Sequence, residues 1–463
     1  MGIPSYFSYI IRKYPSIVSK FGHTIDNFYL DSNSIIYDMV SKMDKNCPTF
    51  ETTLMINVCN KIDEYLSIVQ PKHVFIAFDG VPPMAKIKQQ RDRRYKSWIL
   101  QNMSKKSEWN TIQITPGTTF MNQLNVHLKK HFESYDQKYE FFKLSTSEEY
   151  GEGEHKLFEH IRDYPELHKT TKTLIYGLDS DLIVLSLHHL QYGDIKLLRE
   201  SPAFMMMGDE LHVLDVPSLA DGIKEIVGED RLSDYTFMTF FLGNDFMPHF
   251  PALNLRTRGF DTLLHTYNSC VLPYETLVSG DTIHWDIVQK LINGLAEREH
   301  SVITSEYHSR NRFIADTSTE EAKTNNTPMI KREKELFICP IRTGWENRYY
   351  NTLLKTANLP VICKYYTDML EWNMKYYTIG CVNWQIYYPY MYPPLLNDLK
   401  HHVPQTSELA YNLSRMNETE VLRYVLPTTY HSFIPNEQSK EELVPTLEWS
   451  YCRYIWESHV CFV

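Results

Sequence analysis

Several features that define common protein classes are missing from this sequence of 463 residues. It contains no uninterrupted run of about 18 apolar residues, the length that a membrane helix needs. The first residues, MGIPSYFSYIIRKYP, lack the basic start followed by an apolar run that is typical of a signal peptide. We therefore expect an intracellular protein without membrane contact, cytoplasmic, with the nucleus left open.

Cysteine patterns and two common catalytic motifs are also missing. The eight cysteines are scattered, and no two have CxxC spacing, which argues against a zinc site or a disulfide framework and is typical of a reducing compartment. No segment matches the phosphate-binding motif GxxxxGK[ST]. No serine or cysteine has a persuasive pattern of His and Asp partners for covalent catalysis. Any chemistry has to come from other side chains.

Charge and aromatic content leave the binding partner open. The formal net charge of −10 argues against a general nucleic-acid coat, so any polyanion needs a local basic patch. Aromatic residues make up 13% of the chain and include 32 tyrosines. These rings can pack in a core or stack on bases, and composition does not choose between the two.

Three short apolar runs share one shape: NFYLD ends at Asp31, HVFIAFD at Asp79 and TLIYGLD at Asp179. Each is continuous rather than alternating, which is typical of parallel strands buried on both faces. The pattern predicts an α/β fold with a mostly parallel central sheet flanked by helices. The carboxyl ends of such strands would bring the three aspartates to one edge. Helices are expected at 51–69, 84–101, 117–132 and 154–163.

The chain is expected to fall into three parts. Residues 301–335 are polar and poor in large apolar residues, which predicts a linker or mobile loop between 1–300 and 336–463. Beyond it, residues 344–400 are dense in Tyr and Trp, and their prolines prevent one long helix.

Acidic residues follow the predicted strand ends and mark two further segments. Asp179 and Asp181 in GLDSDL would share one face if the strand stays extended. Glu152 and Glu154 alternate with two glycines in EEYGEGEHKLF, and Asp245 interrupts the apolar FLGNDFMPH. Each acid alone has an ordinary explanation, as a turn former or as a partner of a helix dipole.

Taken together, the acids favour a metal site. Carboxylates gathered in one crevice repel one another unless cations neutralise them. Hard oxygen ligands select Mg²⁺ or Mn²⁺, and two such ions activate a water and stabilise the leaving oxygen in phosphodiester hydrolysis. The candidate metal ligands and catalytic residues are Asp31, Asp79, Glu152, Glu154, Asp179, Asp181 and Asp245.

The segment MAKIKQQRDRRYKS predicts a helix with one basic face. The side chains at helical spacing are Lys86, Gln90, Arg93 and Arg94. A solvated charged face is the ordinary explanation. Arg and Lys also suit a phosphate. Because the segment begins shortly after Asp79, it would then present a phosphorylated end to a hydrolytic metal centre, as an exonuclease requires.

Two aromatic residues are candidates for base stacking, Tyr37 and Trp384. Tyr37 is equally well explained as a core aromatic. His155, directly after Glu154, either orients a phosphate or packs, and packing is the preferred interpretation.

In their order along the chain, these motifs resemble the XRN family of 5′→3′ exoribonucleases. The resemblance begins with MGIPSYFSYIIRKYP and DSNSIIYD and continues through FDGVPPMAKIKQQRDRRYKS, GEGEHK, YGLDSDLIVLSL and FLGNDFMPHFP. It resumes with GWENRYY, CKYYTDMLEW and NWQIYYPYMYPP, and so covers most of the chain. So short a version is similar to the compact enzymes that some large DNA viruses carry.

The resemblance implies a role for each candidate residue. The seven acids correspond to the family's ligands for divalent metal, with two ions expected. Trp384 corresponds to one ring of the family's base sandwich, and Tyr37 stands where the family typically has a His. The family's pocket for the RNA 5′-monophosphate falls on Lys86, Gln90, Arg93 and Arg94.

The resemblance also implies the fold and its division. Residues 1–300 would form a PIN/5′-nuclease-like core, and 336–463 a mostly helical second segment that wraps this core. The family's large accessory domains, and the zinc knuckle of some nuclear members, have no counterpart in the sequence.

The expected function is a Mg²⁺- or Mn²⁺-dependent 5′→3′ exoribonuclease, monomeric, that processively degrades single-stranded 5′-monophosphorylated RNA to nucleoside monophosphates. Two alternatives stay open. A structure-specific DNA 5′-nuclease should carry a helix–hairpin–helix clamp, which we do not find in the sequence. A non-catalytic RNA-binding protein should have lost several of the acids.

Overall fold

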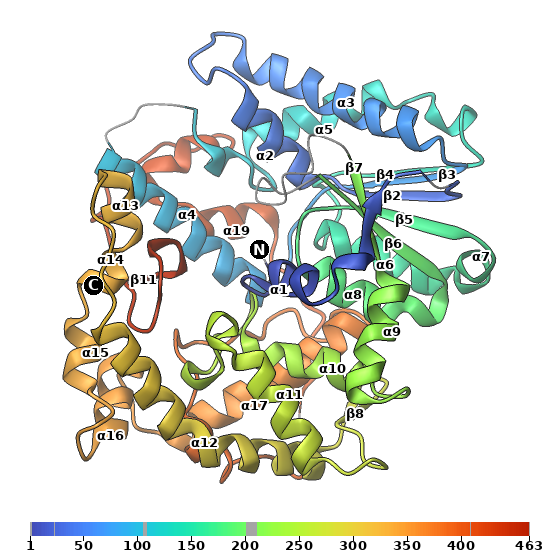
Figure 1. Cartoon of the computed structure of the whole chain (residues 1–463). Coiled ribbons are helices and arrows are strands. Elements are labelled where there is room, and N and C mark those ends of the chain that lie inside the picture. Colours follow the sequence, from blue (N-terminus) through green and yellow to red (C-terminus); the bar gives the residue numbers. More distant parts are fainter. Residues whose placement is uncertain (1, 23, 105–108, 201–210, 408, 463) are drawn as a thin grey trace.

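One sheet organises the N-terminal half of the molecule (Figure 1). The computed structural model describes all residues except 1, 23, 105–108, 201–210, 408 and 463. Within that part, seven strands pair in the order β1-β7-β6-β5-β2-β3-β4. Strands β2 to β6 are parallel, whereas β7 runs antiparallel to β6 and β1 antiparallel to β7. The strands are β1 (Val18–Lys20), β2 (Asn27–Asp31), β3 (His73–Ala77), β4 (Phe141–Ser145), β5 (Lys172–Tyr176), β6 (Asp194–Glu200) and β7 (Leu211–Asp215).

Helices cover both faces of this sheet (Figure 1). The helices α2 (Asn33–Lys42), α3 (Phe50–Val69) and α5 (Thr119–His131) lie on one face. On the other lie α6 (Gly153–Asp163), α8 (Asp181–His189), α9 (Val216–Val227) and α10 (Leu232–Thr239). The short α7 (Pro165–Thr170) joins α6 to β5. The predicted mostly parallel sheet, and the helices predicted at 51–69, 84–101, 117–132 and 154–163, are confirmed, with α4 (Met84–Ser104) as the second of these helices.

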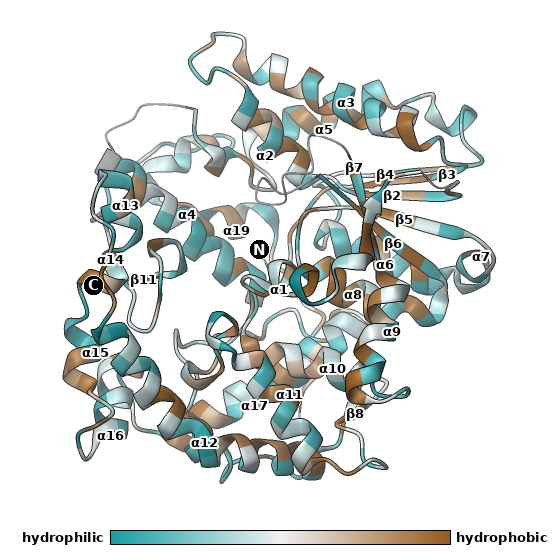
Figure 2. Cartoon of the chain, viewed as in Figure 1, coloured by the Kyte–Doolittle hydropathy of each residue, from teal (hydrophilic) through white to brown (hydrophobic). Residues whose placement is uncertain are grey.

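Alternate residues of each strand pack into different cores, which explains the continuous apolar runs. Phe28 and Leu30 of β2 belong to the core under α2, α3 and α5, whereas Tyr29 between them belongs to the core under α6 and α8. Figure 2 shows apolar residues along the strands. A strand with both faces buried needs apolar side chains at every position.

The segment predicted as a linker or mobile loop is largely helical, and this prediction is wrong. Helix α12 (Trp285–Asn311) crosses the expected boundary at 300. After it come α13 (Glu320–Asn325), α14 (Thr327–Ile330) and α15 (Glu333–Ile338). Arg310 and Arg332 are buried and both form ion pairs with the buried Glu335, and Arg310 also donates to the carbonyl of Cys452 at 2.9 Å. Charged residues made the whole segment look solvated, but three of them, Arg310, Arg332 and Glu335, pair with one another inside the protein.

The C-terminal segment packs onto the sheet domain and shares its core. Trp372 and Tyr377 of α17 (Leu359–Thr378) join the same buried cluster as Leu157 and Leu182 under the sheet. Further elements of this half are α11 (Gly259–Cys270), α16 (Trp345–Tyr349), α18 (Leu396–Leu399), α19 (Glu418–Val425), and the strand pairs β8 (Val278–Ser279) with β9 (Thr282–Ile283) and β10 (Thr446–Glu448) with β11 (His459–Cys461). The helix α1 (Tyr6–Lys13) precedes the sheet at the N-terminal end.

The eight cysteines are free thiols, as their scattered spacing predicted. Among the described residues, no helix combines the length and the apolar content that crossing a bilayer requires.

Candidate active site

The predicted acids lie at the carboxyl edge of the parallel strands. Asp31 is the last residue of β2, and Asp79 and Asp179 follow β3 and β5 within three residues. The first turns of α6 and α8 begin at the same edge and carry Glu154 and Asp181. The remaining two acids, Glu152 and Asp245, both contact the lysine described below.

Gly153 lets α6 come close to the strand ends. Its amide donates to Asp79 Oδ1 at 2.7 Å, and Asn33 Nδ2 donates to the other oxygen at 2.5 Å. A Cβ at residue 153 would lie 2.8 Å from Asp31 Oδ1 and 3.3 Å from the carbonyl oxygen of Ala77. Only glycine therefore fits between the two aspartates and the start of α6.

The N-terminal segment approaches the acids from the other side. Gly2 has a positive φ of 48°, and a Cβ on it would lie 2.6 Å from Asp179 Oδ1 and closer still to Asp181 Oδ1. The backbone of residue 2 is thus part of the wall of the acidic site, which the sequence motifs did not indicate.

Lys86 reaches into the acidic site. Its Nζ lies 2.5 Å from Glu152 Oε2 and 2.8 Å from Asp245 Oδ2, and all three side chains are buried. The sequence had predicted Lys86 as a phosphate ligand. In this structure the Lys86 ammonium instead bridges the carboxylates of Glu152 and Asp245. Two buried negative charges need a cation, and Lys86 is within reach of both.

Burial and mutual repulsion shape the titration of these acids. Burial raises the pKa of Asp31 well above its usual range, and the charges of Asp79 and Asp179 add to the rise. The pKa of Glu154 and of Asp181 is raised for the same two reasons. Burial alone would also raise the pKa of Asp245, but the Lys86 ammonium holds it below its ordinary value.

The donor set fits a hard divalent cation. Asp181 Oδ1 is buried and accepts no hydrogen bond from the described residues. As the side chains stand, no three acidic, His or Cys side chains in the described part of the chain converge as a complete cation cage. The carboxylates around Lys86 and at the strand ends nevertheless offer hard oxygen ligands of the type that Mg²⁺ and Mn²⁺ prefer.

The other three residues of the basic face differ in how far they are already engaged. Arg94 is buried, and its guanidinium donates to Thr115 Oγ1 and to the carbonyl of Ile114, both at 2.9 Å. Gln90 is buried, and its Oε1 has no partner among the described residues. Arg93 is half-buried. These two side chains have free capacity for a ligand.

The two predicted stacking rings lie on different elements. Tyr37 of α2 is half-buried and interacts electrostatically with the Arg94 guanidinium. The carbonyl of Trp384 accepts from the amide of Met84 at 2.8 Å, which holds the backbone of residue 384 beside the start of α4. No ring contact joins Tyr37 to Trp384 in the described part of the chain, so their sandwich stays a prediction.

Trp384 has two neighbours that the sequence did not single out. The Arg415 guanidinium lies 4.3 Å from the centre of its ring, and the edge-on ring of Tyr150 is 6.1 Å away. Arg415 also lies 4.9 Å from the Tyr150 ring centre. Tyr150 could have been noticed from its place in EEYGEGEHKLF, whereas Arg415 belongs to no motif.

A tyrosine from the C-terminal half completes the acidic site. The Tyr376 hydroxyl of α17 donates to Glu152 Oε1 at 2.8 Å, and its ring stacks on His155 at a centroid distance of 3.6 Å. Burial lowers the pKa of His155 well below its usual range, which agrees with a packing role for this histidine. Nothing in the local sequence links Tyr376 to Glu152, since 224 residues separate them.

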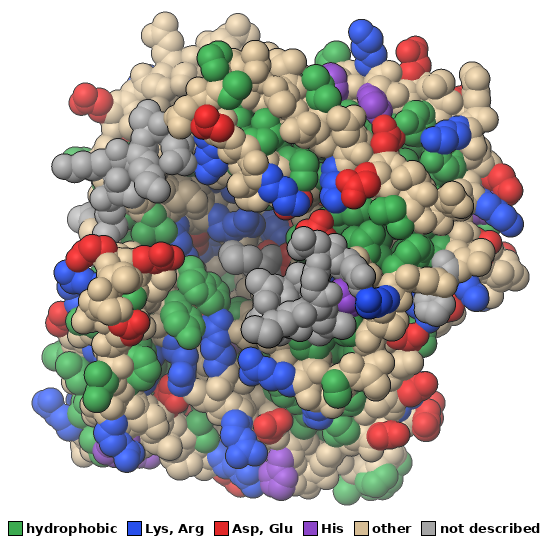
Figure 3. Space-filling view, turned by 45° about the horizontal axis from the view of Figure 1, so that its top comes forward, with side chains coloured by type: hydrophobic (Ala, Val, Ile, Leu, Met, Phe, Trp, Pro, Cys, Tyr) green, Lys and Arg blue, Asp and Glu red, His purple; other side chains and the backbone are tan. Residues whose placement is uncertain are grey.

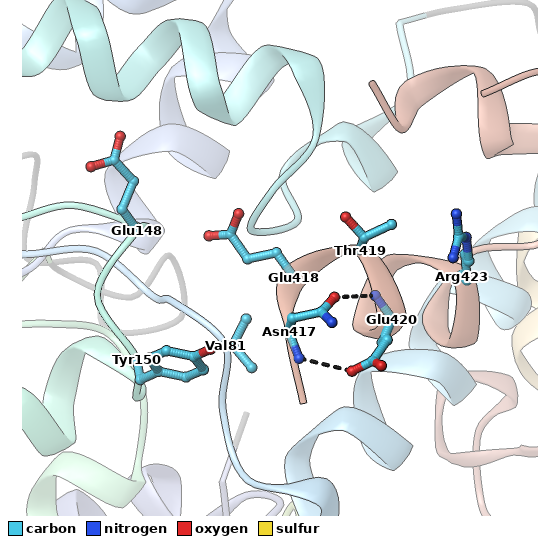
Figure 4. Close-up of a pocket in the computed structure, with 8 residues that line it drawn as sticks. All are labelled: Val81, Glu148, Tyr150, Asn417, Glu418, Thr419, Glu420 and Arg423. Atoms are coloured by element: carbon cyan, nitrogen blue, oxygen red, sulfur yellow. Dashed lines mark hydrogen bonds between the residues drawn. The ribbon is translucent and has the colours of Figure 1, made fainter. Parts of the chain in front are cut away.

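Figure 3 shows one face of the molecule hollowed at its centre, with Lys and Arg side chains gathered in and around the hollow. A separate pocket of about 590 Å³ lies between the loop of Glu148 and Tyr150 and the start of α19 (Figure 4). There the side chains of Glu148 and Glu418 extend into the same space, and burial followed by the charge of Glu148 raises the pKa of Glu418.

Two exoribonucleases from other organisms are similar to the chain over most of its length. A "5′-3′ exoribonuclease 2 homolog" of Drosophila melanogaster is 25% identical over 95% of this chain and 66% of its own length. A "5′-3′ exoribonuclease 1" of Saccharomyces cerevisiae is 25% identical over 94% of this chain and 40% of its own. The chain thus spans less than two thirds of either relative.

Among solved structures, the bacteriophage T5 D15 protein co-crystallised with metal ions aligns over 61% of this chain and 94% of its own. The identity is 10% and the TM-score is 0.31, which is too low to add to the description of the site.

Two family models account for most of the chain. Residues 1–201 match the model described as the N-terminus of the XRN 5′-3′ exonucleases, and residues 227–342 and 341–440 match the model described as the Xrn1 helical domain. The acids and the basic helix belong to the first matched segment, except for Asp245, and Tyr376 belongs to the second. The chain belongs to the XRN family of 5′-3′ exonucleases.

Proposed function

We propose that this chain is a 5′→3′ exoribonuclease that removes nucleoside monophosphates one after another from single-stranded RNA with a 5′-monophosphate. The observation that carries the proposal is the position of α4. This helix starts at the acidic site, where Lys86 contacts Glu152 and Asp245, and continues with the side chains of Gln90 and Arg93 free to bind. One rigid helix would therefore carry both the residues that bind the phosphate and the lysine that contacts the hydrolytic centre.

The acids would hold Mg²⁺ or Mn²⁺ ions, two by our expectation, which when bound supply an activated water and offset negative charge on the leaving oxygen. Asp31, Glu154 and Asp181 are the first candidates to hold them, because burial and repulsion raise the pKa of these three carboxylates and a bound cation would relieve both. Tyr376 would keep Glu152 oriented, as outer hydrogen-bond donors do for metal ligands.

The basic face would select the 5′ end. Gln90 and Arg93 would hold the terminal phosphate, and Lys86 would donate to a phosphate oxygen next to the acids. Gln90 and Arg94 are buried, so the pocket has little room for a triphosphate or a cap. Trp384 and Tyr37 would stack on the terminal bases, an interaction that every base can make.

The test is the degradation of matched RNAs that carry a 5′-monophosphate, a 5′-triphosphate or a 5′-hydroxyl. We expect Mg²⁺- or Mn²⁺-dependent release of nucleoside monophosphates from the monophosphorylated RNA, and at least about tenfold slower release from the others, equivalent to roughly 1.4 kcal/mol of transition-state binding. Equal rates on all three would contradict the pocket. A flap-shaped DNA substrate, if cut faster than RNA, would instead assign a DNA nuclease.

An inactive protein has to be distinguished from a misfolded one. Asp179→Asn removes one charge at nearly constant volume and should abolish release while the thermal unfolding midpoint stays within a few degrees. Asp221→Asn, an exposed acid on α9, is the matched control and should keep full activity. RNA binding without any hydrolysis in the unmodified protein would favour the non-catalytic alternative.

A further inference from the structure

A channel of about 440 Å³ opens beside the acidic site on a second flank of α4. It starts at Gly2 and Asp245 and runs between α4, the loop at 387–392 and the C-terminal residues 450–459. Contacts between α4 and β11 hold the C-terminal wall in place (Figure 1). The volume lies within the range of roughly 300–1,000 Å³ that is typical of pockets for small ligands.

Helical spacing separates this channel from the predicted phosphate pocket. Lys88, Arg93 and Lys96 of α4 line the channel, whereas Lys86, Gln90 and Arg94 do not. Residues one turn apart share a helix face, and Lys88, Asp92 and Lys96 follow this spacing. Arg93 alone belongs both to the predicted phosphate pocket and to the channel, so the two spaces adjoin at this residue.

The cations of the channel are only partly neutralised. Lys88 Nζ is 3.7 Å from Asp92 Oδ2, a long contact, and Lys96 donates to the carbonyl of Trp456 at 2.9 Å. Arg93 makes no hydrogen bond or ion pair with the described residues. The α4 wall therefore presents positive charge that a phosphate would compensate.

The opposite wall is aromatic. Tyr387, Tyr390 and Trp456 line it, and about 41% of Trp456 is exposed. Two polar atoms in the lining, Gln89 Oε1 and Tyr451 Oη, are buried and have no hydrogen-bond partner in the described part of the chain. A ligand with a flat ring and polar edges would satisfy both features.

The pocket shown in Figure 4 is lined by more acidic than basic side chains, in contrast to the channel on α4. It is larger, at about 590 Å³, but Glu148, Glu418 and Glu420 line it, and its one arginine, Arg423, is paired with Glu437 at 2.7 Å. An anionic ligand is repelled there. Charge, rather than size, singles out the channel on α4.

We propose that this channel binds the released nucleoside 5′-monophosphate and leads it away from the acidic site. The proposal rests on the proposed function, which generates that product next to Asp245. A processive enzyme keeps its RNA in the entrance between steps, so the product needs a second way out. The cations of α4 would take the phosphate, and the tyrosines and Trp456 would take the base.

Binding of AMP and UMP to the full chain without divalent metal, measured by calorimetry, tests the site separately from catalysis. We expect both nucleotides to bind within threefold of each other, because stacking tolerates any base, and adenosine or inorganic phosphate alone to bind at least tenfold more weakly. Lys88→Gln and Tyr390→Leu should each weaken AMP binding at least fivefold.

Two matched variants serve as controls. Lys42→Gln removes a lysine with the same i,i+4 aspartate partner on α2, and Tyr274→Leu removes a tyrosine that is 81% exposed. Both should leave AMP binding unchanged. AMP binding that survives in Lys88→Gln and Tyr390→Leu, or no AMP binding at all, overturns the proposal.

Inhibition of RNA degradation distinguishes the channel from the phosphate pocket. Added AMP should inhibit noncompetitively with respect to RNA, and Lys88→Gln should raise the inhibition constant at least fivefold without changing KM. Competitive inhibition would place AMP in the phosphate pocket and overturn the proposal. If the chain degrades no RNA, the proposed function fails, while the binding measurement still decides whether the channel takes a nucleotide.

Discussion

At the scale of single residues, Lys86 and Arg94 show how neighbours on one helix face acquire different roles. Both were expected to bind phosphate, and both are buried. Lys86 carries a compact charge on a flexible stem and turns towards Glu152 and Asp245. The Arg94 guanidinium is held by two oxygens of the 114–115 turn. Lys86 can change partners during a reaction more easily than Arg94.

Gly2 is the residue where the smallest change should have the largest effect. In Gly2→Ala, the new methyl group would collide with the carboxylates of Asp179 and Asp181 and displace them. We expect RNA degradation to slow at least about tenfold, roughly 1.4 kcal/mol in the barrier, with little change in the thermal unfolding midpoint. Gly22→Ala, where a methyl group meets no atom within 4 Å, is the control. Equal rates in both variants would refute the close approach of the N-terminal segment.

We expect Tyr376 to affect the affinity for the metal rather than the affinity for RNA. Tyr376→Phe removes the hydroxyl that donates to Glu152 but keeps the ring on His155. Loss of such an outer donor lowers metal affinity about 10–100-fold, so the Mg²⁺ concentration for half-maximal activity should rise by about that factor while KM for RNA stays constant. An unchanged Mg²⁺ dependence would mean that Glu152 holds its orientation without the tyrosine.

At the scale of elements, α12 and α15 show why a polar segment need not be a linker. Arg310 lies in the last turn of α12, and its side chain is only 2% exposed and pairs with Glu335. The charged composition of 301–335 is that of a solvated loop, but composition does not reveal whether opposite charges meet. Their pairing needs α12, α15 and the residue Cys452 to come together, which no local pattern predicts.

Arg310 should therefore be critical for stability. Arg310→Ala leaves Glu335 buried with one partner fewer, and removal of one member of a buried ion pair costs about 3–5 kcal/mol. Urea unfolding should show this loss in the free energy of unfolding. Arg298→Ala, an exposed position on the same helix, should change it by less than about 0.5 kcal/mol. If Arg310→Ala also lowers the free energy of unfolding by less than about 0.5 kcal/mol, the result would support the linker interpretation instead.

The elements of the sheet were the best predicted part of the fold. Continuous apolar runs predicted β2, β3 and β5 because both faces of each strand are buried, and this leaves no room for polar alternation. The spacing of charge predicted α4 equally well. The short β1 and β7 were not predicted, since three to five residues at the sheet edge carry too weak a pattern.

At the scale of the whole molecule, buried tyrosines of the C-terminal half pack into the same core as the sheet domain. The structure buries Tyr349, Tyr366, Tyr376 and Tyr377 completely or nearly so, and most of the aromatic content thus serves packing. The C-terminal half contributes Tyr376 to the acidic site and Trp384 to the start of α4. Separating the halves would expose a common core and dismantle the site.

Buried histidines should make the molecule sensitive to acid. Burial lowers the pKa of His160, His168 and His188 to about 4. The unfolded chain binds protons at these groups from about pH 6.5 downwards, whereas the folded protein does so only near pH 4. Their contribution to the free energy of unfolding is fully present above about pH 6.5. It is lost as the pH falls from about 6.5 to about 4.

His160→Phe isolates this contribution. The ring of His160 packs against Phe75 and Phe141, so phenylalanine keeps the aromatic contacts and removes the titration. Urea midpoints measured between pH 7.5 and 5 should fall less steeply for the variant than for the unmodified protein. Parallel pH profiles would show that His160 takes up its proton at the same pH in the folded and the unfolded state, and would contradict the lowered pKa.

The sequence by itself determined the strand ends, their aspartates and the charged face of α4, because strand burial and helical spacing are local properties that a short segment carries within itself. The tertiary structure alone decided which partners these side chains meet. Lys86 turns to Glu152 and Asp245, Gly2 packs against Asp179, and the two flanks of α4 open into different spaces. These contacts join residues that lie up to hundreds of positions apart, and their geometry is set by how the whole core packs.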